Sequence, residues 1–209
     1  MNTRNPSLST ESEPGRRTFL IGAASAALLL TGCAAQDPLA AQAKAGDNKN
    51  YIAGDGSVSE YAPENRGEPV QLGGQLYDGT SINSADWSEK VVVLNFWYAS
   101  CAPCRVEAPD LEALHQDFKD QDVLFYGVNV RDTTPTAAAF ERNFGITYPS
   151  FDGADGSILF ALTEHVPPQA VPTTLVLDKQ TRVASRILGV AEKSTLKALI
   201  SSTLDESAS

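Results

Sequence analysis

Two cysteines separated by two residues are the side chains of this sequence best suited to chemistry. Cys101 and Cys104 enclose Ala102 and Pro103, after an apolar run and before a segment with helical periodicity. At a helix start the Cys101 thiol faces unpaired N–H groups and the positive end of the helix dipole, which lower a thiol pKa. Cys101 is therefore the expected nucleophile. Cys104, one turn further in and shielded, is expected to attack the mixed disulfide that Cys101 forms with a partner.

A structural disulfide and half of a metal site are the alternative interpretations of this pair. A structural bridge usually closes a long loop, because closing a two-residue gap removes little entropy from the unfolded chain. A zinc site needs more ligands, and the histidines, His115 and His165, are far apart in the sequence. We favour redox chemistry with no cofactor beyond the cysteine pair. Both histidines are expected on the surface, without a role.

The elements that position the cysteines follow from the residue patterns around them. Residues 91–97 are β-branched and aromatic without alternation, which is typical of a strand buried on both faces. Ser100 is expected to N-cap a helix from about Cys101 to Phe118, in which Pro109 predicts a kink. A second strand over residues 123–130 completes a strand, helix and strand, which predicts a parallel crossover.

The remaining elements are shorter. Gly73-Gly74 is expected to turn a small hairpin between residues 70–72 and 76–77, with Asp78-Gly79 as a second turn signal. Strands over residues 173–177 and 182–188 are expected to pair as an antiparallel hairpin. Whether residues 51–66 pack on the domain is left open. Further helices are expected over three segments: 134–144, 157–164 and 193–204.

Composition and charge limit the classes of function. The 209 residues fit one domain of ordinary size with extra segments. Acidic residues outnumber basic ones by 26 to 16, and no cluster of lysine and arginine is long enough to follow a phosphate backbone. The sequence therefore argues against a nucleic-acid partner.

The N-terminus has the pattern of an export signal. Arg16-Arg17 precedes an apolar run over residues 19–30, which is shorter than the ~20 residues needed to cross a bilayer. Leu30-Thr31-Gly32-Cys33 resembles a bacterial lipobox, which predicts cleavage before Cys33 and lipidation of its sulfur. The alternative is an uncleaved anchor that leaves Cys33 unmodified. Either way, the domain is expected outside the cytoplasm and next to a membrane.

These signals divide the chain into four segments. The composition of the residues after Cys33 cannot offset the entropy of ordering, which predicts a flexible tether. The expected segments are a signal peptide over 1–32, a lipid-anchored tether over 33–50, a folded domain over 51–204 and a C-terminal tail over 205–209.

The motifs taken together resemble one protein family. The run Val93–Trp97 leads into Cys-x-x-Cys-Arg-x-Glu-x-Pro, and Val171-Pro172-Thr173-Thr174 follows before a hairpin. This set resembles the TlpA/ResA-like branch of membrane-tethered thioredoxin-fold proteins, in particular actinobacterial lipoproteins with a stretch like Arg66–Val70. The resemblance implies an α/β, thioredoxin-like three-layer fold, with a central mixed sheet flanked by helices. Residues 134–151 match the insertion typical of the family.

The same resemblance implies roles for residues outside the cysteine pair. Pro172 would be a cis-proline against the cysteines, and Val171 would offer backbone groups to an extended substrate. Asn95 stands where thioredoxin has a buried aspartate, so proton transfer to Cys104 must use water or another group. Glu107 is the nearest charged candidate, although a solvated helix carboxylate is an equally good interpretation.

Three aromatic or polar positions near the cysteines complete the comparison with the family. Trp97 is kept and is expected to support the active site. Ser100 stands where the family commonly has tryptophan, and Tyr98 replaces a small residue. Contacts with partner proteins are therefore expected to differ from those of the family.

The resemblance implies a lipid-anchored thiol–disulfide oxidoreductase on the outer face of the cytoplasmic membrane. Such a protein would reduce protein disulfides, for example in oxidised apocytochrome c, with electrons from a membrane thiol transporter of the CcdA type. Reversed electron flow through the same residues would make an oxidant or isomerase. A tethered peptide-binding module without turnover is the alternative from another class, and the intact cysteine pair argues against it.

Overall fold

The computed structural model describes residues 51–53, 58–167 and 170–206. The predicted signal peptide, the lipidation site Cys33, the tether and the last three residues of the predicted tail lie outside this range. Within the described range, no helix is both long and apolar enough to cross a membrane.

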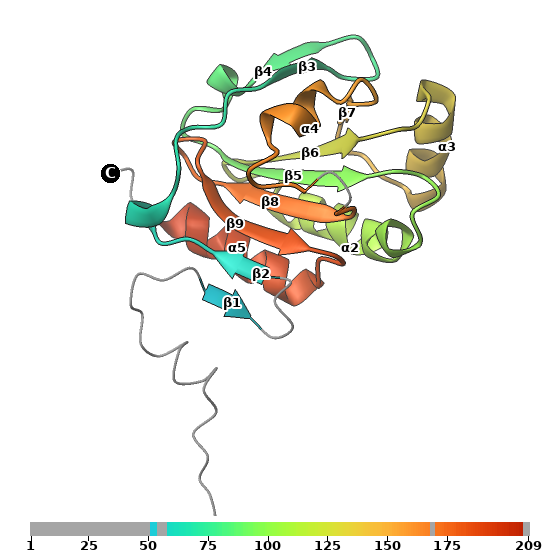
Figure 1. Ribbon diagram of the computed structural model, residues 1–209. Coiled ribbons are helices and arrows are strands. Elements are labelled where there is room, and N and C mark those ends of the chain that lie inside the picture. The colour runs from blue at the N-terminus through green and yellow to red at the C-terminus, as the bar shows by residue number, and fades with distance from the viewer. Residues whose placement is uncertain (1–50, 54–57, 168–169, 207–209) are drawn as a thin grey trace, which may run out of the picture. The chain divides into compact units, whose positions relative to one another are not determined.

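A seven-stranded sheet forms the centre of the described part, in the order β1-β2-β9-β8-β5-β6-β7 (Figure 1). Its central strand, β5, pairs in parallel with β6 and antiparallel with β8, which confirms the predicted crossover and makes the sheet mixed. The predicted hairpin of β8 and β9 is also present. The strands are β1 (Tyr51–Ala53), β2 (Val58–Glu60), β5 (Val91–Trp97), β6 (Val123–Asn129), β7 (Ser150–Asp152), β8 (Thr173–Leu177) and β9 (Val183–Leu188).

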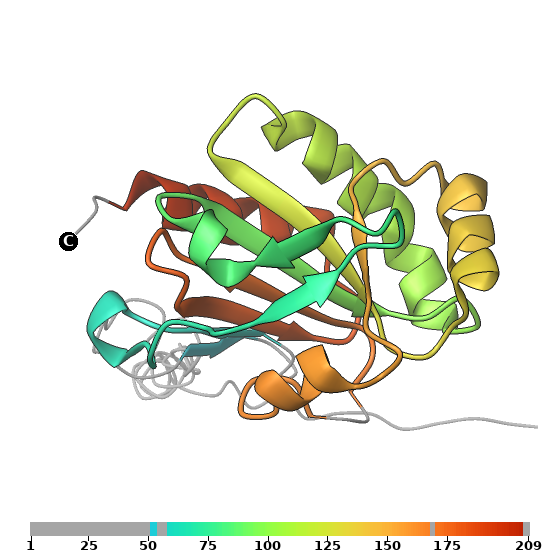
Figure 2. The same ribbon diagram turned by 90° about the horizontal axis from the view of Figure 1, so that it is seen from above.

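Helices and a small hairpin cover the two faces of this sheet, so the predicted three-layer fold is confirmed. Figures 1 and 2 show α2 and α5 on one face, with α4 and the hairpin of β3 and β4 on the other. The bounds are β3 (Gly73–Gln75), β4 (Ser81–Asn83), α2 (Ala102–Phe118), α3 (Thr134–Phe144), α4 (Ser157–Ala161) and α5 (Lys193–Asp205), with 3₁₀ turns η1 (Pro63–Asn65) and η2 (Ser84–Trp87).

Strand β5 is buried along its whole length, as its unbroken apolar pattern predicts. Leu94 and Phe96 belong to the core on the side of α4, with Trp87, Phe151 and Ile158. The intervening residues of β5 contribute to the opposite side, which is covered by apolar side chains of α2 and α5: Leu111, Leu114, Phe118, Leu196, Leu199 and Ile200.

A hairpin is present here, but the prediction that it turns at Gly73-Gly74 is wrong. Both glycines lie in strand β3, and the chain reverses at Asp78-Gly79, where Gly79 has φ +87°. The Asp78 carboxylate accepts the Thr80 N–H at 2.8 Å and closes this turn. A Cβ on Gly74 would lie 3.0 Å from Ile158 and Phe151, so this glycine permits close packing rather than a turn.

Two further boundaries differ from the prediction. Helix α4 ends at Ala161 instead of residue 164, because the chain turns there and Leu162 O accepts the N–H groups of His165 and Val166. The sequence left open whether residues 51–66 pack on the domain. Part of this segment does, because β2 pairs antiparallel with β9. Buried Arg66 then binds Asp178 at 2.9 Å and Glu206 at 2.6 Å, which joins this segment to the end of α5.

Candidate active site

Cys101 and Cys104 form a disulfide where β5 ends and α2 begins. Cys101 itself is the N-cap of α2, and its Sγ accepts the Cys104 backbone N–H at 3.2 Å. The prediction that Ser100 caps this helix is therefore wrong, because the Cys101 sulfur already occupies the acceptor position. Pro103 lies in the first turn, where its missing N–H leaves no helical hydrogen bond unmade.

The two cysteines are equally shielded from solvent. Each is 2 % exposed, in a cluster that contains Trp97, Phe140 and Ala137. The expected shielding of Cys104 is therefore confirmed in the disulfide form, and Cys101 is shielded to the same extent. The ring centroids of Trp97 and Phe140 are 4.4 Å apart, so Phe140 of α3 packs on Trp97 in the cluster that contains the cysteine pair.

The segment before β8 meets the cysteines as the family resemblance implies. The Val171–Pro172 peptide bond is cis. The carbonyl oxygen of Val171 lies 4.0 Å from Cys101 Sγ. Two segments about seventy residues apart in the chain are thus brought together by the pairing of β5 with β8.

Glu107 is not a solvated helix carboxylate. It is 1 % exposed, and its two oxygens accept hydrogen bonds from Asn95 Nδ2 and the Ala191 N–H, both at 2.8 Å. Burial raises the pKa of Glu107 to about 7, against the lowering effect of these two donors. A carboxyl with this pKa exchanges its proton near neutral pH, which suits a group that takes part in proton transfer.

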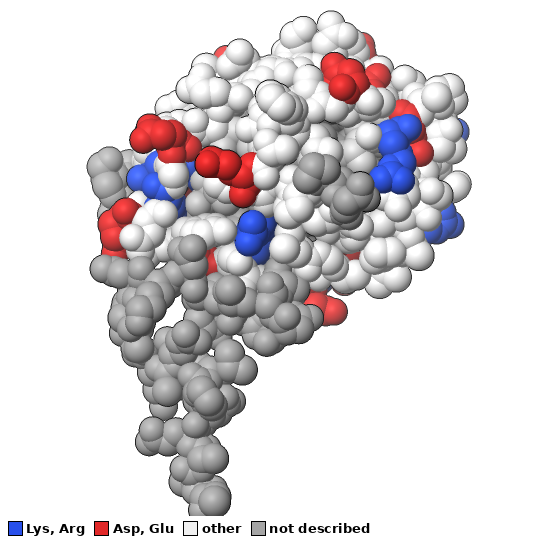
Figure 3. Space-filling model, in the orientation of Figure 1, with Lys and Arg blue, Asp and Glu red and all other residues white. Residues whose placement is uncertain are grey.

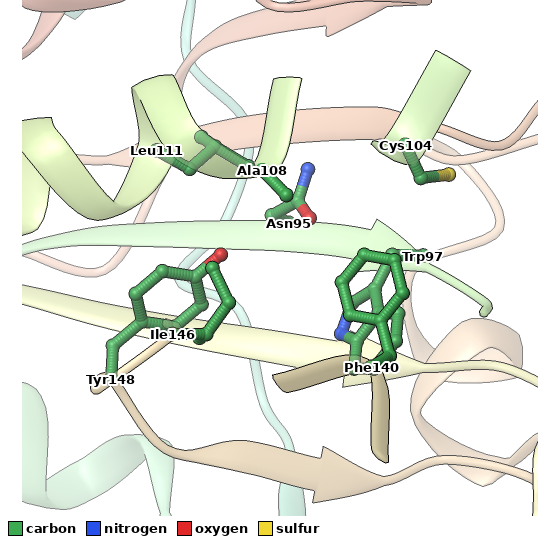
Figure 4. A pocket seen from close by; sticks show the side chains of 8 residues that line it. All are labelled: Asn95, Trp97, Cys104, Ala108, Leu111, Phe140, Ile146 and Tyr148. Carbon is green, nitrogen blue, oxygen red and sulfur yellow. The ribbon is translucent and has the colours of Figure 1, made fainter. Parts of the chain in front are cut away.

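A cavity of about 10 Å³ lies beside Cys104 (Figure 4). Besides Cys104, the lining residues with polar atoms are Asn95, Trp97 and Tyr148, and the others are Ala108, Leu111, Phe140 and Ile146. Sequence reasoning missed Tyr148, because it is distant from the cysteines along the chain and belongs to no motif. Only the folding of the segment after α3 onto β5 and α2 places it here.

The loop before Cys101 is held by a second set of residues that sequence reasoning missed. Asp132 accepts the Ala99 N–H at 2.5 Å and the Asn129 side-chain amide at 2.9 Å. Arg105 donates to the Ala99 carbonyl at 3.2 Å, and the guanidinium of Arg131 lies 3.9 Å from the ring centre of Tyr98. The unusual Tyr98 is therefore held against the loop that follows β6.

Neither histidine is a simple surface residue, and His115 contacts Tyr148 of the Cys104 cavity. His115 is half-buried, with its ring against Phe125 and Tyr148. His165 is also half-buried and lines a separate hollow of about 260 Å³ with Tyr61 and Glu164. Burial lowers the pKa of both imidazoles. In the described ranges, no three His, Cys, Asp or Glu side chains are grouped so that they could hold a metal ion.

Charged side chains are dispersed on the face of the molecule that Figure 3 shows. The blue lysine and arginine groups are separated from one another by uncharged surface. This face therefore offers no continuous basic strip to a polyanion.

The comparison with protein families gives one match that covers more than half of the chain. The AhpC/TSA family model matches residues 66–186, a range that contains the cysteine pair, Glu107 and Pro172.

Characterised relatives and a solved structure agree with this match. Thiol-disulfide oxidoreductase ResA of Geobacillus thermodenitrificans is 32 % identical over 120 residues, which are 57 % of this chain and 67 % of the relative. Thiol:disulfide interchange protein HelX of Rhodobacter capsulatus is 39 % identical over 100 residues, 48 % of this chain and 53 % of the relative. The chain thus spans between about half and two thirds of the curated relatives it matches.

One similar solved structure is that of a secreted thiol-disulfide isomerase from Corynebacterium glutamicum. It has a TM-score of 0.64 and 31 % identity, and the match covers 76 % of this chain and 98 % of that one.

Proposed function

This chain belongs to the AhpC/TSA family and is a thiol–disulfide oxidoreductase of the thioredoxin fold, and from this premise we propose that it reduces disulfide bonds of other proteins outside the cytoplasm. The observation that carries the proposal is the Cys101–Cys104 pair at the start of α2, with the Val171 carbonyl 4.0 Å from Cys101 Sγ. This arrangement offers a sulfur atom and adjoining backbone groups to an extended substrate segment.

The proposed reaction begins from the reduced pair. The Cys101 thiolate attacks one sulfur of a substrate disulfide, and the other substrate sulfur leaves and takes up a proton. Cys104 then loses its proton and attacks Cys101 Sγ. The mixed disulfide breaks, and the second substrate sulfur leaves as a thiol. Two electrons pass to the substrate, and the enzyme ends with the Cys101–Cys104 disulfide.

The environment of each cysteine supports this division of roles. Cys101 Sγ receives the Cys104 N–H at the N-terminus of α2, and such donors stabilise a thiolate. Glu107 lies on the same helix one turn after Cys104, and its pKa of about 7 suits it to accept the Cys104 proton and pass it on. Asn95 orients Glu107, Trp97 packs against the cysteine pair, and Pro103 restricts the backbone between the two cysteines.

The proposal also includes a direction of electron flow and the partner proteins. The TlpA/ResA-like motifs favour a reductant that receives electrons from a membrane thiol transporter of the CcdA type and acts on substrates such as apocytochrome c. The Leu-Thr-Gly-Cys motif supports lipid anchoring through Cys33 at the outer face of the membrane. Changing Cys33→Ala should release the protein from the membrane fraction, and retention there would contradict the anchor.

A trapping experiment tests the cysteine roles and identifies substrates. Cys104→Ser should accumulate mixed disulfides through Cys101, because the step that releases the partner has been removed. Cys101→Ser is the matched control and should trap nothing. Captured apocytochrome c or its assembly proteins would support the proposed substrates. Absence of any Cys101-linked adduct in Cys104→Ser would overturn the reaction.

The similarity to a secreted thiol-disulfide isomerase makes isomerisation the second candidate. Acid quenching and alkylation of the wild-type protein test the reductant, and the enzyme disulfide formed per substrate disulfide lost separates it from an isomerase, which regains its dithiol in each cycle. A reductant should be held largely as the dithiol and shift to the disulfide when the membrane electron donor is deleted. A resting disulfide that does not respond to this deletion would exclude the reductant.

A further inference from the structure

A buried glycine lies in the strand next to the active-site strand. Gly127 of β6 is in register with Asn95 of β5 on one side and with Ser150 of β7 on the other. Its φ is not positive, unlike that of four other glycines in the described residues. Its backbone conformation is therefore one that other residues adopt. A glycine inside a strand often marks the close approach of another group, so the space around Gly127 decides whether a side chain could replace it.

Two side chains occupy the space beside Gly127. A Cβ at this position would lie 2.3 Å from Ser150 Oγ and 2.7 Å from Trp97 Nε1. Both distances are shorter than the ~3.5–4.0 Å at which non-bonded heavy atoms pack well. Ser150 is small, and its hydroxyl has no hydrogen-bond partner among the described residues, so it can rotate away. The larger indole of Trp97 is 3 % exposed, and an added methyl group would displace it into packed surroundings.

The strand register explains this close approach. Trp97 pairs with Asn129 across the parallel strands, which makes Gly127 its diagonal neighbour on β6. Figure 4 shows the Trp97 ring extending from β5 across β6, with the indole nitrogen on the side of β6. The indole therefore lies against the backbone of Gly127, in the space that a side chain at this position would fill.

The other side of the Trp97 ring is packed as well. The ring of Phe140 lies 4.4 Å away between centroids, with 30° between the two ring planes. The Trp97 carbonyl accepts the Val130 N–H at 3.1 Å, which fixes the backbone from which the indole extends. Trp97 and Phe140 belong to one packed cluster with both cysteines. An indole lifted from β6 therefore presses on Phe140 and on the cluster that contains the cysteine pair.

We propose that Gly127 is a positioning residue for thiol–disulfide exchange, because its missing side chain sets the position of the Trp97 indole beside the cysteine pair. This inference rests on the proposed reaction of Cys101 and Cys104. In the disulfide form both cysteines are 2 % exposed within the Trp97 cluster, so closure of the disulfide needs space that a displaced indole would take.

The step that should respond is the attack of Cys104 on Cys101 Sγ, because this step forms the tightly packed disulfide. Cys104 loses a proton and bonds to Cys101 Sγ, while the substrate sulfur leaves and takes up a proton. Gly127 and Trp97 exchange no proton or electron in this step. A methyl group at position 127 should therefore slow the closure without changing its chemistry.

The test uses the full-length chain with Cys33→Ala, which leaves Cys101 and Cys104 as its thiols. The reduced protein is mixed with an excess of an aromatic disulfide that releases a coloured thiolate, dithiobis(nitrobenzoate). Attack by Cys101 releases the first thiolate and attack by Cys104 the second, so stopped-flow absorbance separates two phases. In Gly127→Ala the second phase should be slower by at least about fivefold, the effect of overpacking near the disulfide. An unchanged second phase in the folded variant would overturn the inference.

Two other glycines of the same hairpin strand provide matched controls. Gly73→Ala adds a methyl group whose nearest neighbour is 3.6 Å away, so both phases should stay unchanged. Gly74→Ala places a methyl group 3.0 Å from Ile158 and Phe151 in the core on the side of α4. It should lower the free energy of unfolding and leave the second phase unchanged. Equal slowing by Gly74→Ala and Gly127→Ala would assign the effect to general destabilisation and overturn the inference.

A double-mutant cycle shows whether the effect passes through Trp97. Trp97→Leu has no atom at the position of Nε1, so adding Gly127→Ala to it should slow the second phase by less than about twofold. Ser150→Ala removes the 2.3 Å contact but keeps Trp97, so adding Gly127→Ala to it should still slow this phase by at least about threefold. This second pair also serves if Gly127→Ala alone does not fold. Equal effects in both backgrounds would contradict the role of Trp97.

Tryptophan emission measures the position of the indole independently of the reaction. With Trp87→Phe, Trp97 is the one tryptophan of the chain. A disulfide quenches a neighbouring indole by electron transfer, which falls steeply with distance. The ratio of emission between dithiol and disulfide forms should therefore change when Gly127→Ala is added, and an equal ratio would overturn the inference. Release of only one thiolate by the wild type would instead overturn the proposed role of Cys104, and the emission ratio would still test the placement of Trp97.

Discussion

The two faces of β5 show how one buried strand supports both stability and chemistry. On the side of α4 its side chains are apolar, and Leu94 and Phe96 pack in the larger core without a polar neighbour from the strand. On the side of α2, Val91 and Val93 are apolar as well, but Asn95 is next in the alternation. The polar group thus faces α2 just before the strand ends at the cysteine pair.

The two faces differ because only the face toward α2 holds buried polar groups, which need hydrogen-bond partners. Asn95, Glu107 and Thr174 are all buried, yet Asn95 donates a hydrogen bond to each of the other two, and Glu107 also accepts the Ala191 N–H. A buried polar group without such partners costs the full desolvation penalty. The hydrogen bonds on the active-site face therefore reduce the desolvation penalty of the ionisable Glu107. The side chains of β5 on the other face contribute apolar packing alone.

The largest expected change in the free energy of unfolding comes from a substitution on the apolar face. Leu94→Ala leaves a cavity in a fully buried core position and should lower the free energy of unfolding by about 2–5 kcal/mol. Because Leu94 faces away from the cysteines, the folded variant should react with the aromatic disulfide at the wild-type rate in the first phase. Urea unfolding and stopped-flow absorbance measure the two quantities. A slowed first phase would show that the faces are not independent.

The active-site face should instead show a pH dependence of stability. The pKa of Glu107 is about 7 in the folded protein against 4.5 when unperturbed. Between these values the folded state holds the proton more tightly, so the free energy of unfolding should fall as pH rises, by about 3 kcal/mol in total. Urea unfolding from pH 4 to 8 should show this fall in wild type and a flatter profile in Glu107→Gln. Equal slopes would remove Glu107 as the cause.

A smaller effect is expected in the loop that leads to Cys101. Asp132→Ala removes the acceptor for the Ala99 N–H and the Asn129 amide, and should cost about 1–3 kcal/mol. Asp132→Asn keeps an oxygen at this position and should lose less. Thermal unfolding measures the difference between the two variants. Alkylation of Cys101 should also change more in Asp132→Ala, and identical behaviour of the variants would mean that the loop is held by other contacts.

The smallest effect should come from an apolar side chain of the active-site helix that faces solvent. Val106 is 68 % exposed, two residues after Cys104. Val106→Ser should change the free energy of unfolding by less than about 0.5 kcal/mol, because no packing is lost. Urea unfolding beside Leu94→Ala gives the contrast directly. A loss comparable to that of Leu94→Ala would show that Val106 is covered in solution.

The local patterns predicted much of this protein. The apolar run over 91–97, the cysteine spacing and the helical stripe after it place a redox pair between a buried strand and a helix. They also predict the parallel crossover and the hairpin of β8 and β9, because side-chain periodicity and chain connectivity are properties of neighbouring residues. The motif resemblance led to the thioredoxin-like fold and to the cis bond at Pro172, which the structure contains.

Contacts between distant segments were decided only by the tertiary structure. Glu107 has the sequence pattern of an exposed helix residue, and its burial depends on Asn95 of β5 and on the Ala191 backbone. Tyr148 reaches the Cys104 cavity only because the chain after α3 returns to the sheet. Cys101 rather than Ser100 caps α2, a choice set by where the sulfur lies. Desolvation and hydrogen bonding depend on these neighbours in space, which spacing along a single chain does not encode.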